Sequence, residues 1–111
     1  MRLNISNNVI YNFDGELNTY LYIYSLDASN NQLTDTQAFK NIGYSLRVLY
    51  LNGNNFSVLN NHAFGDLQLL EILNLADNNI TAVRRRSFQG LSNLQELDVS
   101  HNKIETLQGK K

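Results

Sequence analysis

The stretch Leu70-Glu71-Ile72-Leu73-Asn74-Leu75-Ala76-Asp77-Asn78-Asn79-Ile80 decides the fold of this chain of 111 residues. It follows the pattern L-x-x-L-x-L-x-x-N-x-L, in which each L stands for leucine or a similar apolar residue. The same pattern, with conservative changes, occupies residues 23–33, 46–56 and 94–104, and a truncated copy occupies residues 3–10. Repetition at this period indicates a solenoid, in which each unit stacks on the next.

One asparagine stands at the same place in every copy. These residues are Asn8, Asn31, Asn54, Asn78 and Asn102, and their spacings are 23, 23, 24 and 24 residues. An asparagine side chain carries both donors and an acceptor, so it can satisfy backbone groups where a strand ends. We therefore expect the five side chains to form a structural ladder along the solenoid.

The alternation of apolar and polar residues inside each copy predicts a half-buried strand. Leu49 and Leu51 are expected to point inward, and Tyr50 outward. By the same alternation, the later inward pairs are Leu73 with Leu75 and Leu97 with Val99. One strand cannot bury its apolar face alone, so the strands should stack into a parallel sheet over one continuous core.

These residues and their spacing resemble the leucine-rich repeat family. The second half of each unit, with Phe64 and Phe88 at equivalent places, is similar to the 24-residue "typical" class of extracellular members. The run 91–102 looks most like the ectodomains of Toll-like receptors. The resemblance implies an α/β solenoid, a right-handed coil with a parallel β-sheet on the concave face and irregular convex loops. Phe39 comes early for this pattern, so we expect a distorted convex loop near residues 34–45.

The repeats fill the chain as a single leucine-rich repeat domain, residues 1–111. We divide it into a partial repeat at 1–22, repeats at 23–45, 46–69 and 70–93, a last partial repeat at 94–108 and a tail at 109–111. A solenoid exposes apolar cross-sections unless its ends are capped, and a chain without cysteine has no cysteine-rich cap. We therefore expect an excised segment of a larger parent, which forms dimers or higher oligomers through its uncapped ends or edges.

The composition argues against several functions. The net charge is −1, from 9 basic and 10 acidic residues, so nothing attracts nucleic acid to the molecule as a whole. With no cysteine and only two histidines, the chain carries no thiolate-zinc site, no histidine-rich metal site and no thiol nucleophile. No catalytic motif, signal peptide or membrane-spanning run is present. We expect no enzymatic activity, no cofactor, no metal, no nucleic-acid partner and no direct membrane contact.

The outward positions of successive strands line up in columns, which we interpret as a protein-binding face on the concave side. The candidate residues are Tyr24, Asp27, Arg47, Val48, Tyr50, Glu71, Ile72, Asn74 and Asp98. Tyrosine anchors beside polar residues favour protein recognition. The alternative is that these are ordinary solvated strand positions, since any protein surface carries scattered apolar residues.

Three Asn-x-Ser/Thr motifs make Asn4, Asn55 and Asn79 candidates for N-glycosylation. Asn55 and Asn79 follow the ladder asparagine in successive repeats, so both should project from the same flank. The repeat pattern itself generates these two motifs, so they are also compatible with an unglycosylated chain.

We predict a non-enzymatic recognition module. It would be a segment of an extracellular or cell-surface leucine-rich repeat receptor of the Toll-like kind, acting in innate immunity or development, that binds a protein ligand or dimerises. A cell-adhesion leucine-rich repeat protein with homophilic binding is one alternative, and an engineered repeat module is another. A cytoplasmic signalling domain in the parent would select the receptor, and a lipid anchor would select adhesion.

Overall fold

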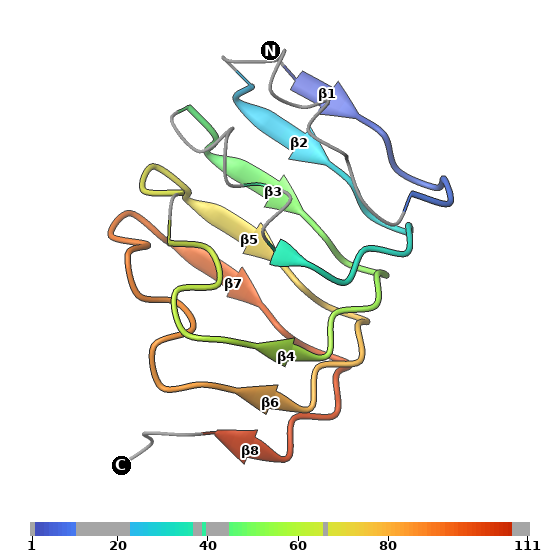
Figure 1. Ribbon diagram of the computed structural model, residues 1–111. Helices are drawn as coiled ribbons and strands as arrows, with labels where there is room; N and C mark the ends of the chain where they lie inside the picture. Colours follow the sequence, from blue (N-terminus) through green and yellow to red (C-terminus); the bar gives the residue numbers. More distant parts are fainter. Residues whose placement is uncertain (1, 11–22, 37–38, 40–44, 66, 108–111) are drawn as a thin grey trace.

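A computed structural model describes residues 2–10, 23–36, 39, 45–65 and 67–107. Five short strands form one parallel sheet in the order β1-β2-β3-β5-β7 (Figure 1). They are β1 (Arg2–Asn4), β2 (Ser25–Asp27), β3 (Val48–Tyr50), β5 (Ile72–Asn74) and β7 (Glu96–Asp98). Each repeat thus contributes one strand, and the strands of successive repeats lie side by side in parallel. This arrangement confirms the predicted parallel solenoid. The described residues contain no α-helix.

The register of this sheet places equivalent positions of the repeat side by side. The central row consists of Leu3, Leu26, Leu49, Leu73 and Leu97. Leu26 and Leu49 are fully buried and Leu73 is 1% exposed, whereas Leu97 on β7 is 40% exposed. The difference arises because β7, among the described residues, has a neighbouring strand on one side only. A leucine in the row is therefore buried where a neighbouring repeat covers it on each side, as at Leu26, Leu49 and Leu73.

A second, three-stranded parallel sheet lies on the opposite side of the coil (Figure 1). Its strands are β4 (Val58–Leu59), β6 (Ala82–Val83) and β8 (Thr106–Leu107), paired in that order. The resemblance to leucine-rich repeats implied irregular loops on this side. Two-residue strands form there because β-branched residues recur in each of them, and such residues suit paired, extended backbone.

The core fills the space between the two sheets. Besides the leucine rows, it contains the aromatic side chains of Phe39, Phe56 and Phe64, each at most 2% exposed. Phe88 is partly buried and packs against the same cluster. Phe39 is therefore inside although it comes early in its repeat. Most of the distorted convex loop predicted near residues 34–45 lies outside the described residues.

The recurring asparagines lie at the turn that follows each strand of the five-stranded sheet. Asn78 shows the arrangement: its amide nitrogen donates to the carbonyls of Leu75 and Ala76 in its own repeat and of Leu51 in the preceding one, at 3.0, 3.2 and 3.1 Å. Its amide oxygen accepts the backbone N–H of Phe56, also in the preceding repeat, at 3.1 Å. Equivalent bonds to two repeats are made by Asn31, Asn54 and Asn102. The asparagines therefore bond each repeat to the previous one.

The residue before each of these asparagines has a left-handed backbone conformation. The φ angles are 61° at Asn7, 55° at Asn30, 75° at Gly53, 56° at Asp77 and 58° at His101. Glycine, asparagine, aspartate and histidine are the residue types that tolerate this region best. At Gly53 an added Cβ would also collide with the Asn30 side chain of the preceding repeat. His101 thus occupies a position where the backbone must be left-handed.

Candidate protein-binding face

The candidate binding residues lie on the solvent side of the five-stranded sheet, which we call the sheet face. Two columns run across β2, β3, β5 and β7 on either side of the buried leucine row. One column consists of Ser25, Val48, Ile72 and Glu96, and the other of Asp27, Tyr50, Asn74 and Asp98. On β2, β3 and β5 these side chains are half-buried, and on β7 they are exposed. The strands therefore hold the predicted residues in fixed columns.

Three of the predicted residues also close the turn at the end of their strand. A carbonyl or carboxylate oxygen of Asp27, Asn74 and Asp98 accepts the backbone N–H two residues later, at 3.1, 2.9 and 2.9 Å. Asn4 makes the same bond at 2.9 Å. Side chains of this length favour such Asx turns. The strand pattern predicted which way these residues face but did not reveal this structural role.

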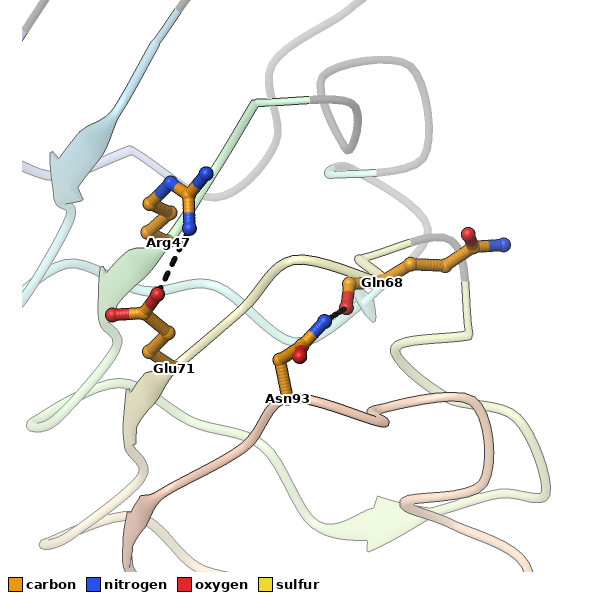
Figure 2. A network of polar contacts seen from close by, with 4 residues as sticks. All are labelled: Arg47, Gln68, Glu71 and Asn93. Carbon is orange, nitrogen blue, oxygen red and sulfur yellow. Dashed lines mark hydrogen bonds and ion pairs between the residues drawn. The ribbon is translucent and has the colours of Figure 1, made fainter.

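Arg47 and Glu71 lie just before β3 and β5 and form an ion pair with an N–O distance of 2.9 Å (Figure 2). Their side chains are 39% and 30% exposed. The Arg47 guanidinium carbon also lies 6.0 Å from the ring centroid of Tyr24 on the preceding repeat. The Arg47 guanidinium therefore interacts with the carboxylate of Glu71 and with the ring of Tyr24.

A hollow of about 290 Å³ opens on the sheet face over β3, β5 and β7. It is lined by Tyr50, Ile72, Leu73, Asn74, Glu96, Leu97 and Asp98. Four of the predicted residues are brought together there, namely Tyr50, Ile72, Asn74 and Asp98. The remaining five, which are Tyr24, Asp27, Arg47, Val48 and Glu71, do not line it.

Leu73, Glu96 and Leu97 line the hollow although the sequence did not single them out as binding residues. Glu96 occupies the same column as Val48 and Ile72, so its place on the sheet face follows from the repeat. Leu73 and Leu97 belong to the inward row, which the strand pattern turns toward the core, and Leu97 is nevertheless 40% exposed. No pattern within one repeat carries that information, because the exposure depends on the neighbouring turn.

The carboxyl group of Asp98 is held in its charged form by two hydrogen bonds. Its pKa is lowered from the ordinary value of 3.8, first by the hydrogen bond from the Ser100 hydroxyl and then by the one from the Ser100 backbone N–H. The hydroxyl lies 2.6 Å from Oδ1 and the backbone nitrogen 2.9 Å. Hydrogen bonds to the charged form favour ionisation, so this edge of the hollow carries a negative charge at neutral pH.

The three candidate glycosylation sites are exposed and lie outside the hollow. The Asn79 amide nitrogen donates to the Asn55 amide oxygen at 2.5 Å, so these two side chains contact each other across successive repeats. In the part of the chain that the structure describes, no helix could cross a membrane. The same residues hold no cluster of three or more histidine, aspartate or glutamate side chains that could bind a metal.

A family model described as leucine rich repeat matches residues 19–80 and 68–110. These matches cover most of the 111 residues, and the chain therefore belongs to the leucine-rich repeat family. Modules of this family generally lack catalytic activity and typically bind proteins. Comparison with curated proteins finds no significant match.

Three solved structures illustrate the similarity in fold. An internalin (inlF) from Listeria monocytogenes has a TM-score of 0.61 at 22% identity, over 90% of this chain and 38% of its own. An internalin C2 from the same organism has a TM-score of 0.57 at 24% identity, over 96% and 60%. TLR13, in a complex with ssRNA13, has a TM-score of 0.64 at 22% identity, over 96% and 22%. The chain thus spans less than two thirds of each of these proteins, and the likeness concerns the fold alone.

Proposed function

We propose that this leucine-rich repeat module binds a protein partner through the sheet face. The observation that carries the proposal is the hollow, where Tyr50 and Ile72 supply apolar surface beside the polar groups of Asn74, Glu96 and Asp98. An apolar centre with an aromatic anchor and a polar rim is typical of protein interfaces. The parallel strands hold these groups in a fixed arrangement, which lowers the entropic cost of binding.

Within the family, we propose a segment of an extracellular or cell-surface receptor of the Toll-like kind. The resemblance of residues 91–102 to Toll-like ectodomains and the three exposed glycosylation motifs support this assignment. The fold similarity does not favour one parent, because internalins share it. Nucleic acid is not the ligand we propose for the hollow, since Glu96 and Asp98 would repel phosphate groups.

The test is a peptide-display selection on the wild-type chain, followed by binding assays on two matched variants. The first variant carries Tyr24→Ala, Tyr50→Ala and Ile72→Ala on the sheet face. The second, the control, carries Arg85→Ala and Gln89→Ala, two exposed residues outside the hollow. Circular dichroism establishes that both variants are folded. Selected peptides should lose binding to the first variant and keep it with the second, and equal binding to both would refute the proposal.

Self-association is a second candidate function, and it would also suit homophilic adhesion. The observation that favours it is the pair of outer strands: among the described residues, β1 and β7 each pair on one side only. Leu97 on β7 and Val9 after β1 are 40% and 73% exposed. An unpaired strand edge beside apolar surface can pair with another chain. Light scattering during size-exclusion chromatography of a dilution series should then detect a dimer that dissociates, and a monomer at every concentration would exclude this candidate.

A further inference from the structure

We infer that the hollow receives an arginine or lysine side chain of the partner protein. This inference rests on the proposed function, since it specifies the chemistry of the residue that the partner inserts. The occupant is thus a surface segment of a folded protein or a peptide, with a basic residue at the centre of the contact. The charge, the hydrogen bonds and the apolar wall of the hollow each support it.

The hollow carries negative charge that the described part of the chain does not neutralise. Glu96 and Asp98 both line it, and both are exposed on β7. The single ion pair among the described residues joins Arg47 to Glu71, so Arg47 is already engaged. A cation supplied by the partner would complement these two carboxylates, neither of which forms an ion pair among the described residues, and such charge complementarity selects partners across interfaces.

Asp98 presents its carboxylate in a fixed orientation. Both hydrogen bonds from Ser100 go to Oδ1. The other oxygen, Oδ2, accepts no hydrogen bond from any residue that the structure describes. The Asx turn therefore holds one oxygen and leaves the second available to a donor from outside. An acceptor that is already oriented loses little entropy when it binds a guanidinium or ammonium group.

The apolar wall suits the stem of a long basic side chain. Tyr50 and Ile72 lie around the same hollow as the carboxylates. Arginine and lysine bury their methylene groups against apolar surface while the charged head reaches polar groups, and a tyrosine ring adds attraction for a cation. The volume of about 290 Å³ is at the small end of ligand pockets, which fits one side chain.

The experiment uses two tripeptide probes, N-acetyl-Leu-Arg-Leu-amide and N-acetyl-Leu-Gln-Leu-amide, titrated into the isotope-labelled chain and followed by NMR. The arginine peptide should shift the backbone amides of residues 50, 72 and 96–98 in a saturable way, and the glutamine peptide should not. Asp98→Asn should weaken binding about fivefold, the change that roughly one exposed ion pair accounts for. Equal shifts with both peptides, or none with either, would overturn the inference.

Asp27→Asn is the matched control. Asp27 lies in the same column, and its Oδ1 accepts the N–H and hydroxyl of Ser29 at 3.1 and 2.7 Å, as Asp98 does with Ser100. It lies outside the hollow. Asn4 and Asn74 close the equivalent turn with an amide, so both aspartate substitutions should keep the fold and remove one charge. Binding of the arginine peptide should fall with Asp98→Asn alone. An equal fall with Asp27→Asn would mean that the net charge of the protein, and not the hollow, determines binding, and it would overturn the inference.

The display selection separates this inference from the proposed function. Selected peptides that need Tyr50 and Ile72 and are rich in arginine or lysine would support both. Peptides that need Tyr50 and Ile72 but carry no basic residue, and that bind Asp98→Asn normally, would overturn the inference and leave the proposed function standing. Peptides that ignore the sheet-face substitutions would overturn both.

Discussion

Each buried asparagine of the ladder serves two repeats at once. Asn78 is 7% exposed and bonds to backbone groups on both sides of the boundary between repeats. Its removal would leave the N–H of Phe56 without a partner and would take one of two donors from the carbonyls of Leu51, Leu75 and Ala76. A buried backbone group without its hydrogen bond costs about 1–3 kcal/mol. The ladder is therefore a main source of cohesion between turns of the coil.

We predict that Asn78→Ala lowers the free energy of unfolding by about 3 kcal/mol. Urea denaturation followed by circular dichroism gives this value. The matched control is Asn79→Ala at the neighbouring exposed position, where surface substitutions usually change stability by less than about 0.5 kcal/mol. If both variants lose the same stability, the ladder bonds do not hold the repeats together.

We predict that Ser100→Ala raises the pKa of the Asp98 carboxyl toward 3.8, because the hydroxyl bond is the largest cause of the lowering. The value should stay below 3.8, because the backbone bond from residue 100 remains. An NMR titration of the side-chain carboxyl carbon measures it. A folded-state pKa below the unfolded one stabilises the protein above the unfolded pKa, and this contribution is lost as the pH falls through the folded value. Ser29→Ala, the control, should leave the Asp98 titration unchanged.

Among the elements, the leucine row shows how burial depends on the neighbouring strand. Leu73 on β5 and Leu97 on β7 occupy adjacent places in the row, yet one is 1% exposed and the other 40%. We predict that Leu73→Ala lowers the free energy of unfolding by about 2–5 kcal/mol, whereas Leu97→Ala lowers it by about 1 kcal/mol. Urea denaturation of the two variants tests this prediction. If both variants lose the same free energy of unfolding, Leu73 is not more deeply buried than Leu97.

The sequence predicted the parallel strands and the spacing of the repeats, because apolar alternation and the recurring asparagine are local patterns. It did not predict the Asx turns at Asp27, Asn74 and Asp98, because the period of a strand gives the direction of a side chain and not its hydrogen bonds. Residues 7, 30, 53, 77 and 101 are of the types that tolerate positive φ, so this signal was present in the sequence. The two-residue strands of the second sheet are too short for any period to reveal.

The whole molecule is a stack in which each turn contacts its neighbours in a constant register. Leu49, Leu73 and Leu97 follow one another at intervals of 24 residues, so removal of residues 70–93 should bring Leu97 beside Leu49. We predict that this deletion variant still folds and unfolds cooperatively, with a smaller urea m-value because one turn less of surface is buried.

The control for the repeat deletion removes half a turn, residues 70–81. This change would place a strand of one repeat beside the loop of the next, so the variant should show no cooperative unfolding transition. Circular dichroism during urea denaturation distinguishes the two deletions. If the full-turn deletion also fails to unfold cooperatively, the repeats are not interchangeable units.

The second sheet also determines how strongly the stack bends. Strands paired by hydrogen bonds lie about 4.8 Å apart, whereas packed helices lie about 8–10 Å apart. From β3 to β8 the repeats are strand-paired on both sides, so each turn advances by nearly the same distance along either side (Figure 1). Helices on the far side would bend the stack into a tight arc, because they need more space per repeat than paired strands do. This part of the molecule is therefore less strongly curved than a stack with helices on its far side, and a partner bound as we propose would meet three successive repeats at once.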